Sequence, residues 1–146
     1  MRPELDVWEP GEHNGTFRGL NLAFVTATAA LDFWDDPAFL ELVQSNSEQL
    51  RDTLDGLCER FPSAVRKGRG LFTGLELHDA EAAQRAKHEA FERGLILETC
   101  GPTGSVLKTT PPINITPETL AEGLDVLEGA LTCALPTPAW AAGGRD

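Results

Sequence analysis

A polar loop rich in glycine lies directly before a long apolar segment near the start of the chain. The loop spans residues 11–19 and reads GEHNGTFRG, and the apolar segment continues to Trp34. Thr16 offers a hydroxyl and a backbone N–H as hydrogen-bond donors, and the adjacent Gly15 has no side chain to keep a ligand away from the backbone. These donors can hold an anion, although a loop threonine can equally satisfy its own backbone.

Two further polar side chains stand in this loop. The His13 ring can change its charge near neutral pH, but it can also simply brace the turn before Thr16. Arg18 can line the same site or form an ordinary ion pair with one of the many acidic residues. We therefore expect a binding role for the loop and assign no catalytic residue to it.

The overall charge of the chain limits its partners. The 146 residues carry 23 acidic against 12 basic side chains, a formal net charge of −11, and 41% of them are hydrophobic. A field of this sign repels nucleic acid and acidic membrane surfaces. The length and the apolar content predict one globular domain with its own core.

The sequence shows no pattern typical of a targeting or membrane-spanning segment. Met1 is followed by Arg-Pro-Glu-Leu-Asp, without the basic and then apolar order of a signal peptide. The apolar run from Leu20 to Trp34 is shorter than the roughly 20 residues that span a bilayer. We therefore expect a cytoplasmic protein, and the odd number of cysteines agrees with this. We expect no metal site, because the cysteines have no metal-ligand spacing. They are Cys58, Cys100 and Cys133.

Capping residues and apolar periodicity predict four helices. Asn21 is expected to cap the first, which ends near Trp34. In the later helices a capping residue precedes an apolar face with three- to four-residue spacing, and two of them have proline at the first helical position. These helices begin after Asp36, Asp79 and Thr116, and the first two of them end near Arg60 and Arg93.

Between the helices the apolar pattern changes to short runs that are typical of strands. Glycines and prolines separate these runs and predict tight turns. The expected strands are residues 64–69, 71–77, 95–99 and 105–109. The order of elements predicts an α+β fold, with helices on a small, largely antiparallel sheet.

Several short motifs follow one another in an order and at separations that resemble a known family. They are HNGTFRG at 13–19, RGL with a further glycine at 69–74, GLI at 94–96, and a lysine followed by PPINIT at 108–116. In this arrangement the chain resembles the C-terminal part of a class III pyridoxal-phosphate aminotransferase. The stretches RPELDVWEPGEHNGTFRG and GLILETCGP are most similar to diaminobutyrate–2-oxoglutarate aminotransferases of ectoine biosynthesis.

The resemblance implies a domain organisation. The fold would be the small C-terminal domain of a fold-type-I aminotransferase, preceded by a loop and a linking helix. Residues 1–34 would be the phosphate-loop segment and linking helix from the large domain, and residues 35–135 the small domain. Residues 136–146 would form a flexible tail.

The resemblance also implies pyridoxal phosphate as the cofactor. The family holds it as a Schiff base on a lysine of the large domain. That lysine is expected upstream of residue 1, because Lys67, Lys87 and Lys108 do not stand in its sequence context. We therefore expect the chain alone to be inactive, with pyridoxal phosphate bound only where a large domain completes the site.

Four positions match or depart from the family pattern at its binding site. Thr16 matches the threonine that binds the cofactor phosphate across the dimer interface, and Gly15 lets that phosphate approach. Lys108 matches a position where many members carry an arginine for the substrate α-carboxylate; a lysine supplies a point charge there without the bidentate fork. Lys108 can also be a solvated lysine at a strand edge. Leu20 replaces an asparagine that helps to cap the following helix.

By resemblance, the reaction transfers an amino group between glutamate and an aspartate-semialdehyde-type acceptor, giving 2,4-diaminobutyrate and 2-oxoglutarate. The expected protein partner is the large pyridoxal-phosphate domain or the dimer mate of the same enzyme. Other readings stay open. The chain can be a fragment of an ornithine-type or 4-aminobutyrate-type class III enzyme, a non-enzymatic remnant, or an interaction module that uses the apolar run beginning at Leu22.

Overall fold

The computed structural model describes residues 2–12, 14–15 and 17–135 of the chain. The chain divides into two compact units, an N-terminal unit, Met1–Pro37, and a main unit, Ala38–Asp146. The tail predicted at residues 136–146 lies outside the described residues.

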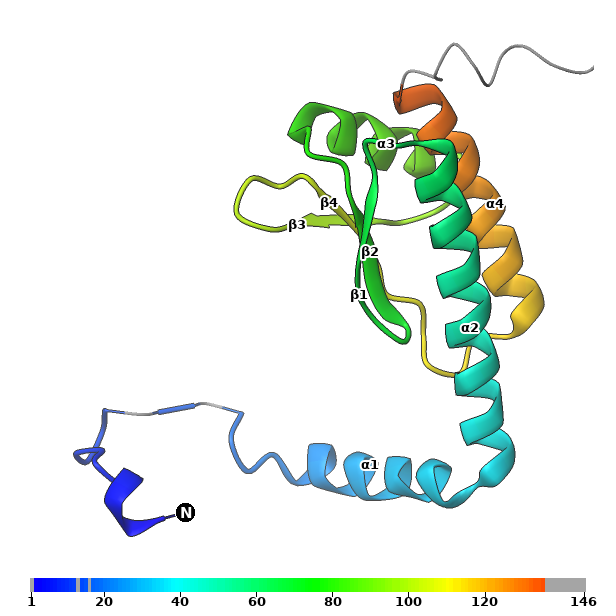
Figure 1. The fold of residues 1–146 in the computed structure, drawn as a ribbon. Helices are drawn as coiled ribbons and strands as arrows, with labels where there is room; N and C mark the ends of the chain where they lie inside the picture. The colour runs from blue at the N-terminus through cyan, green and yellow to red at the C-terminus, as the bar shows by residue number, and fades with distance from the viewer. Residues whose placement is uncertain (1, 13, 16, 136–146) are drawn as a thin grey trace, which may run out of the picture. The chain divides into compact units, whose positions relative to one another are not determined.

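The main unit combines helices with a four-stranded sheet (Figure 1). Its elements are α2 (Pro37–Arg60), β1 (Val65–Arg69), β2 (Phe72–Glu76), α3 (Ala80–Glu92), β3 (Glu98–Cys100), β4 (Val106–Thr109) and α4 (Pro117–Ala134). The strand order across the sheet is β1-β2-β4-β3, and each neighbouring pair is antiparallel. The predicted α+β fold is confirmed.

Two helices of the main unit begin at the predicted capping residues. The Asp79 carboxylate accepts a hydrogen bond from the Glu81 N–H at 2.9 Å. The Thr116 hydroxyl oxygen accepts one from the Thr119 N–H at 3.3 Å. Both bonds satisfy backbone donors that the first turn of a helix leaves unpaired.

The strand expected at residues 95–99 is shorter in the structure and begins at Glu98. Gly94 follows α3 with φ +87°, the left-handed conformation that glycine readily adopts after a helix. The Leu95 N–H then donates to the Ala90 carbonyl at 2.9 Å. Because this bond ties Leu95 to the end of the helix, the strand pairing starts later than the apolar run.

In the N-terminal unit, α1 (Asn21–Leu31) differs from the prediction at its start. Asn21 is the first helical residue and Leu20 is the N-cap, and no side chain caps the helix. The expectation that Asn21 caps it is wrong, and the leucine that departs from the family pattern takes the capping position. A 3₁₀ turn, η2 (Asp32–Asp35), continues α1 to the predicted end.

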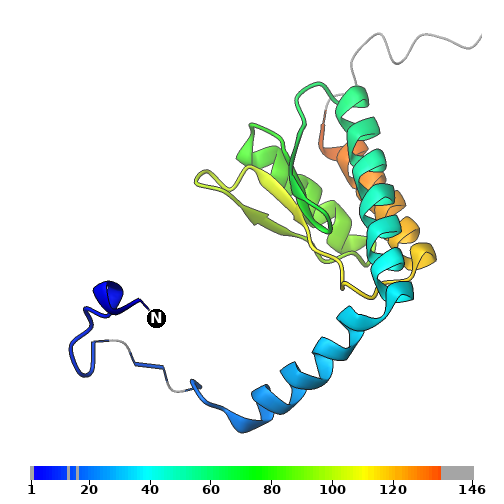
Figure 2. The ribbon, with the colours of Figure 1, turned by 60° about the horizontal axis from the view of Figure 1, so that its bottom comes forward.

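The hydrophobic core lies between one face of the sheet and the helices. Leu75 of β2 and Leu107 of β4 point into it and are fully buried. α2 and α4, which run side by side in Figures 1 and 2, contribute mainly leucines, whereas α3 contributes alanines that allow close packing. The helix residues are Leu50, Leu54, Leu57, Ala82, Ala83, Ala86, Ala90, Leu120, Leu124, Leu127, Ala130, Leu131 and Ala134. Each fully buried leucine stabilises the fold by about 1.5–3 kcal/mol.

The other face of the sheet has no such layer among the described residues of the main unit, and we call it the open face. Side chains alternate between the two faces of a strand, so the pairing register assigns its members. They are Val65, Lys67, Arg69, Phe72, Gly74, Glu76, Glu98, Cys100, Val106 and Lys108. All except Gly74 are exposed or half-buried, and Phe72 is 71% exposed.

The two central strands approach closely at Gly74. A Cβ at this position would lie 2.6 Å from the Leu107 carbonyl oxygen and 3.2 Å from the Lys108 Cα. Any other residue would therefore push β4 away from β2. The glycine leaves a position without a side chain in the middle of the open face.

A polar cluster joins the end of β2 to the segment before β4. Glu76 Oε1 accepts hydrogen bonds from Ser105 Oγ at 2.6 Å and from the His78 backbone N–H at 3.0 Å. Chiefly through the Ser105 hydroxyl, these donors hold the pKa of Glu76 below its usual value. The second bond also fixes His78, whose φ of 56° is unfavourable for a residue other than glycine.

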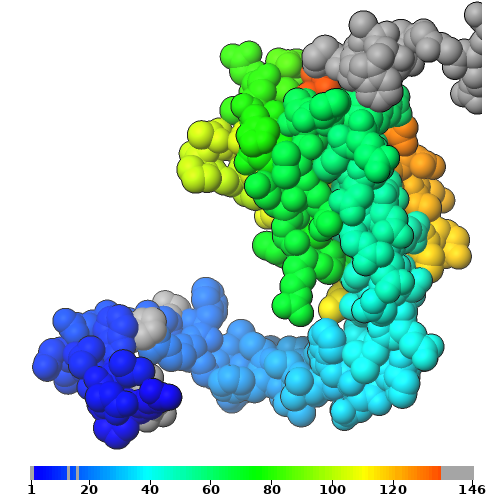
Figure 3. Space-filling model, in the orientation of Figure 1, coloured from blue at the N-terminus to red at the C-terminus, as the bar shows by residue number. Residues whose placement is uncertain are grey.

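The N-terminal unit buries none of its described residues. Its large apolar side chains are exposed, among them Phe17 at 81% and Leu22 at 73%. Figure 3 draws this unit in space-filling form, in blue. The others include Phe24, Val25, Leu31, Phe33 and Trp34. A helix as short as the 11-residue α1 is marginally stable without tertiary packing.

Gly74→Ala is expected to lower the free energy of unfolding by about 1–3 kcal/mol, because the added methyl group overpacks the gap between β2 and β4. Gly129→Ala is the matched control, since Gly129 lies within α4 with nothing within 4 Å of an added Cβ. This change should stabilise the helix by about 0.5–1 kcal/mol. Denaturant unfolding of both variants measures the difference; a Gly74→Ala protein as stable as the wild type would contradict the close approach.

Ser105→Ala is expected to destabilise the protein in a pH-dependent way. The lowered pKa of Glu76 contributes stability above the unfolded-state value, about 4.3, and this contribution is lost as the pH falls through the lower folded-state value. The variant loses the Ser105 hydroxyl, which is the main cause of the lowered Glu76 pKa. The difference in free energy of unfolding between the variant and the wild type should therefore shrink below about pH 4. Thermal unfolding at several pH values measures it, and a deficit that does not change with pH would refute the assignment.

Candidate functional site

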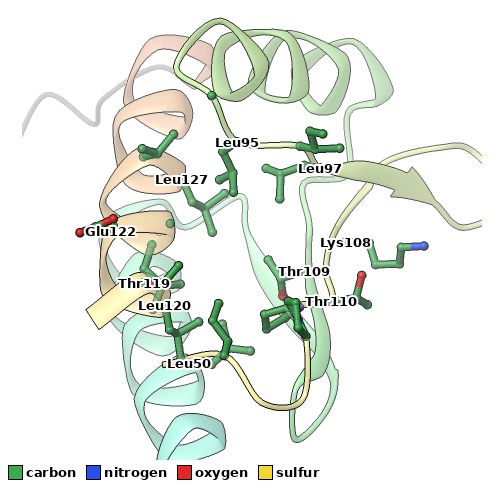
Figure 4. Close-up of a pocket in the computed structure, with 18 of the residues that line it drawn as sticks. Leu50, Leu95, Leu97, Lys108, Thr109, Thr110, Thr119, Leu120, Glu122 and Leu127 are labelled. Carbon is green, nitrogen blue, oxygen red and sulfur yellow. The ribbon is translucent and has the colours of Figure 1, made fainter. Parts of the chain in front are cut away.

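A cavity of about 600 Å³ lies between α4 and the segments around β3 and β4 (Figure 4). Its wall is largely aliphatic, with Leu50, Leu97, Leu120 and Leu127 among the lining residues. Polar side chains also line it, including Thr109, Thr110, Thr119 and Glu122. Its volume is in the range of small-molecule sites. The apolar pattern of the sequence predicted helices and a strand at these positions and gave no signal for a cavity.

Lys108 is among the residues that line this cavity, and its side chain points away from Leu120 and Leu127 (Figure 4). The residue lies in β4, within the predicted strand, and is half-buried. Its neighbours Leu107 and Thr109 are buried on the core face. The alternation along β4 therefore brings the ammonium group of Lys108 to the open face.

The other two lysines occupy different surroundings. Lys87 lies in α3, and its Nζ is 3.4 Å from Glu98 Oε2. Lys67 lies within β1, inside the strand predicted at residues 64–69, and Gly74 is its cross-strand partner. Since Gly74 also pairs with Lys108, the structure places Lys67 and Lys108 on the same row of the open face. No role was predicted for Lys67, and its place on this row follows from the pairing register.

The glycine-rich loop is described except for His13 and Thr16, so the predicted roles of these two residues lie outside the described residues. The Gly15 carbonyl accepts a hydrogen bond from the Arg18 N–H at 3.0 Å. A Cβ at Gly15 would lie 3.6 Å from Arg18 Nη2. The guanidinium group therefore packs over the turn at Gly15, and it brings a positive charge to the position predicted to approach a phosphate.

The described part of this loop fits one end of pyridoxal phosphate. The exposed Gly15 and the adjacent Arg18 guanidinium suit a dianionic phosphate, to which arginine donates charge-assisted hydrogen bonds. A Schiff base needs a lysine, and residues 1–37 contain none. The N-terminal unit thus has donors for the phosphate and lacks the residue that would hold the cofactor ring.

A buried amide connects α2 to the segment before α4. Asn46 is fully buried, its Nδ2 donates to the Ile115 carbonyl at 2.7 Å, and its Oδ1 has no partner among the described residues. No role was predicted for Asn46, although position 46 falls between the apolar residues Val43 and Leu50 on the inner face of the predicted helix. The contact fixes the start of α4 and, with it, one wall of the cavity.

Chemistry at cysteines or metals would depend on the surroundings of Cys58 and on the grouping of metal-ligand side chains. Burial raises the pKa of the Cys58 thiol and so disfavours the nucleophilic thiolate. Among the described residues, no group of three or more His, Cys, Asp or Glu side chains is placed to hold a metal ion. In the same part of the chain, no helix has the length and apolar character needed to cross a membrane.

Comparison with known proteins yields matches over most of the chain. The family model of class III aminotransferases matches residues 4–131. A diaminobutyrate–2-oxoglutarate transaminase of Streptomyces anulatus is 51% identical over 87% of this chain, and one of Bordetella parapertussis is 48% identical over 92%. The matches cover 30% and 32% of those relatives, so the chain spans about a third of their length.

Solved structures agree with this assignment. An N-acetylornithine aminotransferase from Stenotrophomonas maltophilia is 33% identical with a TM-score of 0.63, over 73% of this chain and 30% of its own. An acetylornithine aminotransferase from Elizabethkingia anophelis is 26% identical with a TM-score of 0.65, over 86% of this chain and 33% of its own. In sequence and in fold, the chain belongs to the class III aminotransferase family.

Proposed function

We propose that this chain is the C-terminal, small-domain part of a diaminobutyrate–2-oxoglutarate transaminase that depends on pyridoxal phosphate. The observation that carries the proposal is the 51% identity to the Streptomyces anulatus enzyme. The two acetylornithine aminotransferases reach 33% and 26%. This difference favours the diaminobutyrate type over an ornithine-type enzyme.

In the proposed organisation, residues 1–34 carry the phosphate loop and the linking helix, and residues 35–135 form the small domain. Pyridoxal phosphate, when bound, supplies an electron sink for the charge that develops at the substrate α-carbon. Gly15 and Thr16 hold its phosphate through the backbone and the hydroxyl, and the Arg18 guanidinium lies beside Gly15. The lysine for the ring belongs to the large domain.

Lys108 serves the substrate in this proposal. Its ammonium group reaches the open face because Leu107 and Thr109 are anchored on the core face. There it attracts a substrate carboxylate as a point charge and orients it without the two parallel bonds that an arginine forms. The role of Lys108 is thus to bind and position, and proton transfer falls to the lysine of the large domain.

The exposed N-terminal unit supports a large domain or a dimer mate as the protein partner. The apolar side chains of α1 and its flanks, among them Phe17, Leu22 and Phe24, are 60–81% exposed. Large apolar side chains exposed in this number indicate an interaction site. The same observation would suit a non-enzymatic interaction module, which is the second candidate function.

The chain alone is expected to show no transamination between 2,4-diaminobutyrate and 2-oxoglutarate in the presence of pyridoxal phosphate, because the N-terminal unit has no lysine for the cofactor. Mixing it with the unmatched part of the Streptomyces anulatus relative, produced as a separate chain, should restore glutamate formation. That unmatched part alone is the control. Activity of this chain by itself, or a mixture no more active than the control, would refute the proposal.

In the restored enzyme, Lys108→Ala is expected to raise the KM for 2-oxoglutarate about tenfold and to change kcat less, because a binding charge is lost and the chemistry is untouched. Lys108→Arg should keep the KM within a few-fold, since the charge remains. Steady-state kinetics distinguishes the two variants. An unchanged KM in Lys108→Ala would show that Lys108 is only a solvated strand residue.

A further inference from the structure

We propose that Lys67 and Lys108 together form a two-cation site on the open face that binds a dicarboxylate across Gly74. This inference rests on the proposed function, in which Lys108 receives a substrate carboxylate, and it adds Lys67 as a second binding residue. Its basis is the register: Lys67 pairs with Gly74 on one side, and Lys108 pairs with Gly74 on the other.

The geometry suits a ligand with two separated charges. Neighbouring strands lie about 4.8 Å apart, so the Cα atoms of Lys67 and Lys108 are roughly 10 Å apart. Both side chains leave the same face of the sheet, and each is long and flexible enough to approach the other above Gly74. A five-carbon dicarboxylate such as 2-oxoglutarate can then place one carboxylate at each ammonium group.

The floor between the two lysines is free of side chains for a physical reason. A Cβ at Gly74 would lie 2.6 Å from the Leu107 carbonyl oxygen, so the close packing of β2 and β4 excludes every larger residue. Val106 is the next residue on this face, and its Cγ1 lies 3.2 Å from the same Cβ position. A ligand therefore meets backbone and an aliphatic edge between the two charges.

The charges around the site favour an anion. Arg69 extends the cationic edge on β1, two residues from Lys67 and on the same face. The two acids of the open face are engaged elsewhere: Glu76 accepts from Ser105 and His78, and Glu98 pairs with Lys87. In the described part of the chain neither Lys67 nor Lys108 has an ion pair within 4 Å, although Lys67 contributes weakly to the lowered pKa of Glu76. In a chain of net charge −11 this cluster is a local exception.

The test is an NMR titration of the 146-residue chain with 2-oxoglutarate, with the backbone amide of Gly74 as the reporter. We expect saturable chemical-shift changes at Gly74 and Lys108 in the wild type. Acetate and inorganic phosphate should bind more weakly than 2-oxoglutarate. The Lys67→Gln variant should bind 2-oxoglutarate about fivefold more weakly, in line with the loss of one exposed ionic contact. Arg51→Gln removes the same charge from an Arg51–Asp52 pair on α2 and should bind like wild type.

Absence of saturation at Gly74, or equal affinities in wild type and Lys67→Gln, would overturn the two-cation site. Equal binding of acetate or phosphate would overturn the dicarboxylate assignment. The titration needs neither the cofactor nor the large domain. It can therefore fail while the transaminase activity is restored, or succeed while that activity is absent.

Discussion

The alternation of Leu107 and Lys108 along β4 is the constraint from which the rest of the structure follows. Leu107 is fully buried against the helices, and a slip of one residue would exchange it with a lysine in the core. The same register fixes Glu98, Gly74 and Lys67 on the row of Lys108. One buried leucine thus determines which charged groups meet on the open face.

A sheet covered on one face explains how a small domain can be stable and still present a binding surface. The leucines of α2 and α4 and the alanines of α3 bury the core face. The open face then keeps polar and charged side chains with aliphatic ones between them. In the main unit, stability and proposed binding are assigned to opposite faces of the same strands. Gly74 contributes to both, because it allows the close spacing of β2 and β4 and places no side chain on the open face.

Local sequence signals predicted the helices and strands well. Asp79 and Thr116 accept capping hydrogen bonds as their positions predicted, because capping depends on a few neighbouring residues. The predicted start of α1 was wrong, because Leu20 takes the N-cap position that a polar residue was expected to fill. The later start of β3 depends on a bond from Leu95 back to α3, which no apolar pattern reveals.

The candidate site was predicted less completely. Lys108 was found by resemblance to a family motif, whereas Lys67 became notable only when the register showed that both lysines pair with Gly74. The apolar cavity and the buried Asn46 depend on contacts between residues far apart in the sequence. The roles of Thr16 and His13 stay predictions, since these two residues lie outside the described residues.

The central claim is that this chain completes a larger aminotransferase through its exposed N-terminal unit. Calorimetric titration of the chain with the unmatched part of the Streptomyces anulatus relative tests it most directly. The account predicts saturable one-to-one binding with a negative heat-capacity change, because the apolar side chains around α1 leave water on association. It also predicts that Phe24→Ser weakens the binding, since Phe24 is 60% exposed on that helix. No heat of binding, or binding without a heat-capacity change, would contradict it.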